Sequence, residues 1–166
     1  VLRDPRVSPR NRAVSHGSRG GAYARMHQFE KAIQDFDEAI RLNPSLTQAY
    51  AHRGKAYLKL RKPEKAMEDL DEALRRGFRD HRLFTDRGAA YLSRQDADRA
   101  IIELDKAINL RPDYAVAYAY RGNAYAAKKN HSRAIQDFET AVRQGFRDPK
   151  LFYNLGKASR ASKQYK

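Results

Sequence analysis

Four arginines stand at equal spacing along the chain, and each is followed sixteen residues later by an acidic residue. The four pairs are Arg19 with Asp35, Arg53 with Asp69, Arg87 with Glu103, and Arg121 with Asp137. A row of arginines on one face could bind phosphate groups. An arginine beside a carboxylate instead forms charge-assisted hydrogen bonds, while its stem covers apolar surface. Because every arginine has its own acid, we expect ion pairs between neighbouring helices and favour them over a phosphate-binding row.

The other chemically active residue types give no catalytic or metal-binding pattern. The chain has no cysteine, which excludes thiolate metal sites and thiol nucleophiles. Five histidines lack the spacing of metal ligands, and none completes a serine, histidine and acid signature; they are His16, His27, His52, His81 and His131. The glycine-rich segment 17–21 follows no predicted strand, so it does not match a phosphate-binding loop. We therefore expect no enzymatic activity, no cofactor and no metal site.

The charge is strongly positive and is concentrated at the two ends. The formal net charge is +14, yet residues 13–148 hold 25 basic and 19 acidic residues, an excess of only six. Residues 1–12 carry four arginines against one acid, and residues 149–166 carry five basic residues and no acid. Such ends could bind nucleic acid or another polyanion. This remains an alternative function, although the balanced centre of the chain weakens it.

Nothing in the sequence indicates insertion into a membrane. The longest stretch with little charge, 112–120, is too short and too polar to cross a bilayer, and no basic-then-apolar leader is present. The absence of cysteine fits several compartments. We expect a soluble protein and favour the cytoplasm.

A pattern with a period of 34 residues runs through the chain. Alanine stands two residues after each glycine of this pattern, and tyrosine stands one residue further in the first four repeats. Alanine recurs again twelve and nineteen residues after each of the first four glycines. The glycines themselves are Gly20, Gly54, Gly88, Gly122 and Gly156. This self-similarity predicts a tandem array of one small structural repeat.

Each repeat contains two amphipathic segments, which we call helix A and helix B. With the glycine numbered as position 8, positions 4, 8 and 11 share one face of helix A, and positions 20, 24, 27 and 28 share one face of helix B. Lys62-Pro63, Asp96 and Asn130 separate the segments and supply turns and helix starts. Glycine inside a helix costs about 1 kcal/mol relative to alanine. We therefore expect helix B to cross too closely for a side chain at position 8, with the small alanines at positions 20 and 27 at the crossing.

Two repeats end in the same sequence, Gly-Phe-Arg-Asp. A glycine followed by an apolar residue predicts a left-handed helix C-cap at Gly77 and Gly145. The aspartates that follow, Asp80 and Asp148, are expected to cap the next helix A. This recurring segment is therefore interpreted as a connector and not as a catalytic motif.

The repeated motif resembles that of tetratricopeptide repeat (TPR) proteins. The family pattern of aromatic, Gly, Tyr, Ala, large apolar and Ala residues occurs in the fourth repeat as Tyr118, Gly122, Tyr125, Ala134, Phe138 and Ala141. The resemblance covers residues 13–166 and implies an all-α, right-handed superhelical solenoid of antiparallel helix pairs. It gives repeats at 13–46, 47–80, 81–114 and 115–148, followed by a partial repeat at 149–166 that supplies a terminal helix.

The resemblance also implies a concave groove lined by the A helices. Positions 2, 5, 6, 9, 12 and 13 would face it, because positions 4, 8 and 11 face the core. These positions offer scattered hydrogen-bonding groups, some positive charge and tyrosine rings, which suit an extended peptide or a partner helix. We expect a protein-interaction scaffold, with candidate groove residues Gln48, His52, Lys55, Arg82, Asp86, Tyr120, Asn123, Lys150, Tyr153, Asn154 and Lys157.

One known ligand of such grooves is the acidic tail of heat-shock chaperones, held by a Lys, Asn and Arg carboxylate clamp. No register of this sequence supplies the clamp; from the first repeat its positions hold Gly17, Gly21, His52, Arg82 and Asp86. We therefore expect no clamp-type binding of chaperone tails.

The two ends depart from the repeat. Residues 1–12 show no helical period and are interpreted as a basic linker or arm, and glycines are expected to weaken helix A of the first repeat. The chain stops at Lys166 where helix B of the last repeat would begin. A polar cap and a longer array both fit, and Tyr165 favours the longer array. Self-association through this last repeat or the arm is a further possibility.

Overall fold

The structure is a computed structural model that describes residues 8–164. Residues 1–7 and 165–166, and with them the prediction drawn from Tyr165, lie outside the described residues. The described range forms nine α-helices without a strand: α1 (Pro9–Arg25), α2 (Phe29–Leu42), α3 (Thr47–Lys59), α4 (Pro63–Arg75), α5 (His81–Ser93), α6 (Ala97–Leu110), α7 (Ala115–Ala127), α8 (His131–Arg143) and α9 (Pro149–Gln164).

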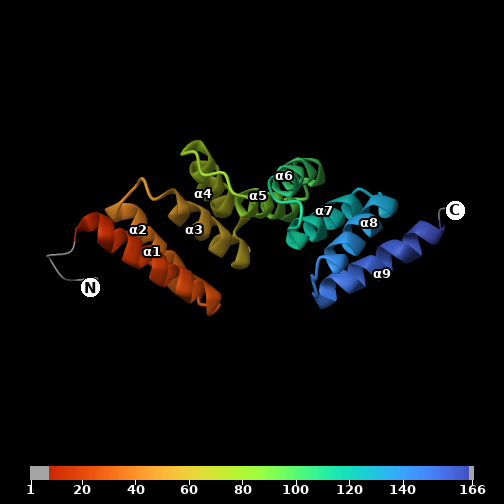
Figure 1. Ribbon diagram of the computed structural model, residues 1–166, viewed down its shortest axis with the longest axis horizontal. Coiled ribbons are helices and arrows are strands. Elements are labelled where there is room, and N and C mark those ends of the chain that lie inside the picture. Colours follow the sequence, from red (N-terminus) through yellow and green to blue (C-terminus); the bar gives the residue numbers. More distant parts are fainter. Residues whose placement is uncertain (1–7, 165–166) are drawn as a thin grey trace. The chain divides into compact units, whose positions relative to one another are not determined.

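The helices pack as hairpins in sequence order, as the repeat predicts. Helix A and helix B of successive repeats are α1 with α2, α3 with α4, α5 with α6, and α7 with α8, while α9 packs on α8 (Figure 1). The chain divides into two compact units, which we call unit 1 (Val1–Arg79) and unit 2 (Asp80–Lys166). The described part of unit 1 holds α1 to α4, and that of unit 2 holds α5 to α9.

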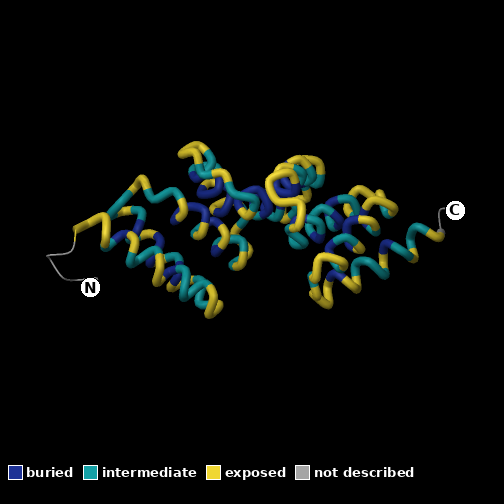
Figure 2. Tube along the Cα trace, viewed as in Figure 1, coloured by how far each residue is buried: buried dark blue, intermediate teal, exposed yellow. Residues whose placement is uncertain are grey.

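Each unit has its own hydrophobic core between the facing sides of its helices (Figure 2). In unit 1, Phe36 is completely buried and packs with Ala32, Ala39 and Ala49. In unit 2, the completely buried Phe138 occupies the equivalent place, among alanines of α7, α8 and α9. The core therefore alternates one large side chain with several small ones, which brings the helices of a pair close together.

The glycine at position 8 lies where helix B comes closest. A Cβ atom added to Gly54 would lie 2.9 Å from Cγ of Leu70 and 3.1 Å from the carbonyl oxygen of Ala66. At Gly122 it would lie 2.6 Å from the ring of Phe138. The expected close crossing is confirmed, with one correction. The nearest atoms belong to the large side chain at position 24 and, at two crossings, to the backbone at position 20, not to the alanine at position 27.

The connectors have the predicted geometry. Gly77 and Gly145 adopt left-handed φ angles of 85° and 89°. The amide of the phenylalanine after Gly77 donates to the carbonyl of Ala73 at 3.0 Å, which closes the last turn of α4. The carboxylate of Asp80 accepts the amide of Arg82 and so caps α5.

The turns inside the hairpins contain a feature that the sequence analysis missed. A residue other than glycine adopts a left-handed φ of 56° to 61° in each turn, at His27, Arg61, Gln95 and Lys129. These residue types carry no strong preference for that conformation, so the amino-acid pattern gave no signal. The expected caps of the next helices, Asp96 and Asn130, are present and accept backbone amides of α6 and α8.

The first helix begins several residues earlier than the repeat pattern predicts. Residues 9–12 belong to α1 and not to an arm. Ser8 caps the helix by accepting the amide of Asn11, and Pro9 occupies the first helical position, where a backbone amide would have no partner within the helix. The glycines at 17, 20 and 21 do not interrupt this helix.

The glycine contacts predict opposite effects of two identical substitutions. Gly54→Ala should lower the free energy of unfolding by about 1 kcal/mol, because overpacking costs about 1–3 kcal/mol and outweighs the gain in helix propensity. Gly156→Ala should raise it by up to about 1 kcal/mol, because the nearest atom to its added Cβ is Nη1 of Arg160, 3.9 Å away. Urea unfolding followed by circular dichroism measures both. An increase in stability for Gly54→Ala would contradict the close crossing.

Candidate functional site

The four arginines of the repeat are held by the acids that the sequence pairs with them. Two nitrogens of Arg19 donate to Asp35 at 2.6 Å each, and Arg53 and Arg121 contact their acids in the same two-point manner. Nη1 of Arg87 donates to Glu103 at 2.5 Å. The predicted ion pairs between helix A and helix B are confirmed. Each arginine of the row is therefore engaged by a carboxylate of the neighbouring helix.

Two of these arginines also reach an acid of the preceding repeat. Nη1 of Arg53 lies 2.5 Å from Asp37, and Nη1 of Arg121 lies 2.6 Å from Asp105. The hydrogen bonds to Asp137 raise the pKa of Arg121 even though burial opposes this. Each guanidinium thus joins three helices of its own unit, which leaves the opposite side of helix A for other contacts.

The candidate groove residues of unit 2 fall into two neighbouring sets. Nδ2 of Asn154 on α9 donates to Oδ1 of Asn123 on α7 at 2.8 Å, so two predicted positions of successive A helices meet. Tyr153 is 63% exposed, and Nζ of Lys157 lies 5.6 Å from its ring centre. Here α7 and α9 present an amide pair beside an accessible aromatic ring.

The second set lies on α5 and α7. Burial raises the pKa of Tyr120, and the nearby charge of Asp86 adds to this effect, so these two predicted residues are neighbours. Arg82 instead contacts Asp80, with Nη2 3.2 Å from the carboxylate at the start of α5. Its guanidinium is therefore partly engaged by the capping residue. Lys150 lies outside this set, at the start of α9, where its amide donates to Asp148.

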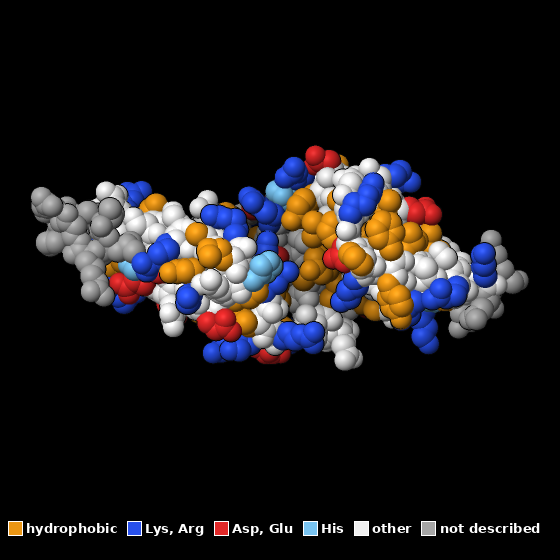
Figure 3. All heavy atoms as spheres, turned by 90° about the horizontal axis from the view of Figure 1, so that it is seen from below, with side chains coloured by type: hydrophobic (Ala, Val, Ile, Leu, Met, Phe, Trp, Pro, Cys, Tyr) orange, Lys and Arg blue, Asp and Glu red, His pale blue; other side chains and the backbone are white. Residues whose placement is uncertain are grey.

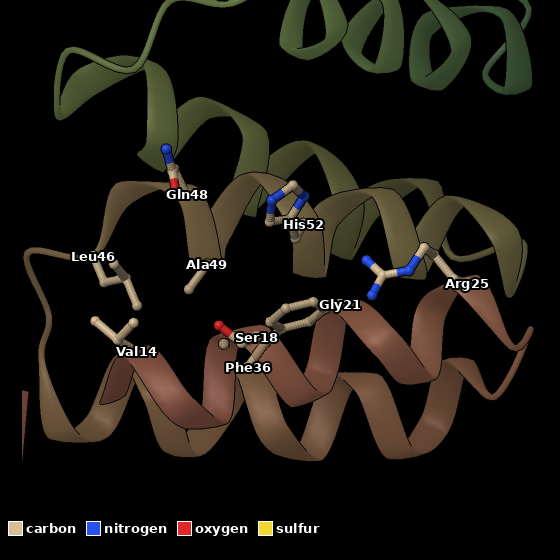
Figure 4. Close-up of a pocket in the computed structure, with 10 residues that line it drawn as sticks. Val14, Ser18, Gly21, Arg25, Phe36, Leu46, Gln48, Ala49 and His52 are labelled. Atoms are coloured by element: carbon tan, nitrogen blue, oxygen red, sulfur yellow. The ribbon is translucent and has the colours of Figure 1, made fainter. Parts of the chain in front are cut away.

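The candidate groove residues of unit 1 line two adjoining cavities between α1 and α3. The first has a volume of about 370 Å³ and is lined by Gln48 and His52 of α3, and by residues of α1 (Figure 4). The second, of about 270 Å³, is lined by His52 and Lys55. The cavities share four lining residues, Gly21, Arg25, Phe36 and His52. The three predicted residues of unit 1 are thus gathered at one hollow.

Several residues of this hollow were not among the predicted site residues. Gly17 and Gly21 line it, although the sequence analysis did not list them as site residues. Arg25 and Lys59 also line it, and both occupy position 13 of their repeats. A basic residue at position 13 occurs in only the first two repeats. This difference between repeats could have pointed to Arg25 and Lys59 as site residues.

The surface chemistry of the two units differs in the view of Figure 3. In unit 1, basic, histidine and some acidic side chains surround small hydrophobic areas, whereas hydrophobic side chains gather in a larger area over unit 2. Among residues 8–164, no group of three or more His, Cys, Asp or Glu side chains could hold a metal ion. In the same range, no helix is both long and apolar enough to cross a membrane.

Comparison with known proteins identifies the family. Tetratricopeptide repeat profiles match residues 13–46, 53–115 and 85–151, which together cover most of the chain. The chain belongs to the tetratricopeptide repeat family. The TPR helix pairs predicted from the motif are those of the structure, and the fold class is all-α. A search of curated protein sequences gave no match.

Solved TPR structures share the fold at low sequence identity. YrrB, described as a TPR protein with an unusual peptide-binding site, is 22% identical, with a TM-score of 0.71 over 91% of this chain and 78% of its own. MamA is 22% identical, with a TM-score of 0.73 over 90% and 82%. PilF of Pseudomonas aeruginosa is 19% identical, with a TM-score of 0.78 over 92% and 70%. These likenesses concern the fold alone.

The buried TPR ion pairs predict a large effect of removing one partner. Arg121→Gln should lower the free energy of unfolding by about 3–5 kcal/mol, because it leaves the carboxylate of Asp137, 8% exposed, without its charge partner. The matched control is Arg41→Gln, whose side chain is 68% exposed beside Glu38 and whose loss should have a much smaller effect. Equal losses in the two variants would show that burial of the pair has no influence.

A pH dependence follows from Asp35. Burial opposes its ionisation, but hydrogen bonds from Arg19 and His16 lower its pKa. A lowered folded-state pKa contributes stability above the unfolded-state pKa, and this is lost as the pH falls through the folded-state value. Asp35→Asn should therefore be less stable than the parent at neutral pH, with the difference shrinking in acid. Thermal unfolding at several pH values checks this, and a constant difference would contradict it.

Proposed function

We propose that this TPR protein is a non-enzymatic interaction scaffold that binds a peptide segment or a helix of a partner protein. The binding surface is the groove lined by the A helices, formed by positions 2, 5, 6, 9, 12 and 13 of each repeat. The observation that carries the proposal is the hollow between α1 and α3 of unit 1, which the predicted residues Gln48, His52 and Lys55 line.

The chemistry of these faces suits a peptide. Amide side chains such as Asn123 and Asn154 can donate to and accept from a peptide backbone, and an exposed ring such as Tyr153 can pack on its side chains. The peptide-binding site described for YrrB, which shares the fold, supports this use of the repeats. Because the core arginines are already paired, the remaining specificity would come from the A-helix faces.

A second candidate is binding of nucleic acid or another polyanion through the basic ends. It is favoured by the run of Lys150, Lys157, Arg160 and Lys163 along α9, without an acid in that helix. Such binding would weaken steeply with salt, because it would release counterions from the polyanion.

A displayed library of random peptides tests the proposed function. Selection against the whole chain should return peptides whose binding is weakened about tenfold or more by His52→Ala or by Tyr153→Ala, each on a different unit, because truncating an interface residue can remove over 1.4 kcal/mol. Isothermal titration calorimetry of the selected peptides gives the affinities.

The control for Tyr153→Ala is Ile102→Ala, which removes a side chain of similar exposure, 54%, from helix B of another repeat. It should leave the affinity unchanged. Peptides that respond to Ile102→Ala but to neither A-helix variant would place the binding surface on the B helices and contradict the proposal.

A further inference from the structure

The hollow of unit 1 differs from an ordinary gap between helices because packing does not require its glycines. A Cβ on Gly17 would have Cδ2 of Leu46 as its nearest neighbour at 3.6 Å, and a Cβ on Gly21 would have Nη1 of Arg25 at 3.8 Å. Both distances are ordinary contacts. At Gly20, one residue away, the Cβ would come within 2.9 Å of Phe36. Side chains at 17 and 21 would thus fit, and their main effect would be to fill the space between α1 and α3.

The floor of the hollow is apolar. The ring of Phe36, completely buried, lies under it and stacks on His52 with ring centres 5.9 Å apart. Ala24, Phe29 and Ala56 complete the floor of the smaller cavity. Cavities for whole small ligands span about 300–1,000 Å³, so the smaller cavity, about 270 Å³, suits a single large side chain.

The rim of the hollow is basic. Five basic or histidine side chains line the smaller cavity, and the described residues that line either cavity include no acid. The five are Arg25, His27, His52, Lys55 and Lys59. A recess with charges of one sign concentrates its potential and attracts the opposite charge. The occupant that matches both floor and rim therefore carries a bulky apolar side chain with carboxylates beside it.

We propose that unit 1 binds an acidic peptide segment by inserting one bulky apolar side chain between α1 and α3. The carboxylates that flank this side chain contact the basic rim. The inference rests on the proposed function and adds the chemistry of the ligand. Single-stranded nucleic acid would match the basic rim but has no aliphatic side chain to fill the apolar floor.

The direct test uses a short fluorescent peptide in which one leucine lies between glutamates, with fluorescence anisotropy as the readout and the whole chain as the receptor. The blocking variant is Gly21→Leu, which places a side chain in both cavities. It should weaken binding roughly 10- to 100-fold, the affinity equivalent of one large buried side chain. It should not lower the melting temperature, because leucine is a better helix former than glycine.

Gly156→Leu is the matched control, because the nearest atom to its added Cβ is also an arginine nitrogen four residues later, at 3.9 Å. It should leave the affinity unchanged.

A second pair of variants tests the charge of the rim without altering the cavity. Lys55→Gln should weaken the peptide several-fold, with the loss greatest at low salt, whereas Lys65→Gln on α4 removes the same charge elsewhere and should have no effect.

Two changes to the peptide complete the test. Replacing its leucine by alanine should abolish most of the binding, and so should replacing its glutamates by glutamines. Unchanged peptide binding by Gly21→Leu would overturn the inference. Displacement of the peptide by a single-stranded oligonucleotide, as readily as by unlabelled peptide, would also overturn it and would favour a polyanion site. If this peptide fails while library-selected peptides still respond to the A-helix variants, the inference falls and the proposed function stands.

Discussion

The close approach of helix A to helix B at the position-8 glycine determines the geometry of each repeat. A large side chain at position 24 occupies the space where a Cβ would otherwise stand, as Leu104 does against Gly88 at 2.6 Å. Because the interior of a protein is close-packed, this contact fixes both the separation and the face of each helix that turns inward. Gly20, Gly54, Gly88 and Gly122 carry it through four hairpins without insertion or deletion.

That separation lets the arginine at position 7 reach the acid at position 23 with short, two-point contacts in three of the four hairpins. The pairs neutralise most charge near the core and hold the arginine stems against apolar surface. The opposite side of helix A is left free of these packing demands, so its residues vary from repeat to repeat. At position 9 the five repeats have Gly21, Lys55, Ala89, Asn123 and Lys157. Because these surface residues vary while the helix packing stays the same, one unit has a basic hollow and the other has an amide pair beside an exposed ring.

Periodicity predicted the helices, the hairpin pairing and the arginine pairs, because each depends on spacing that recurs from repeat to repeat. Local residue types predicted the caps at Asp80, Asp96 and Asn130. Periodicity did not predict the start of α1, where the absence of a helical period suggested an arm, although Ser8 and Pro9 are residue types that begin helices. It also did not reveal the hollow. The cavity exists because Gly17 and Gly21 have no side chains. A search for residues that recur in every repeat does not detect side chains that are missing from one repeat. All the candidate groove residues stay predictions until a ligand is bound.

The central claim is that the A-helix faces bind the partner and the B helices do not. Nuclear magnetic resonance of the isotope-labelled chain, titrated with the acidic leucine peptide, tests it most directly, because every backbone amide reports separately. The account predicts that the largest chemical-shift changes lie along the facing sides of α1 and α3, at Gly21, Arg25 and His52 and their neighbours. Changes concentrated on the exposed sides of α2 and α4, around Lys31 and Lys65, would contradict it.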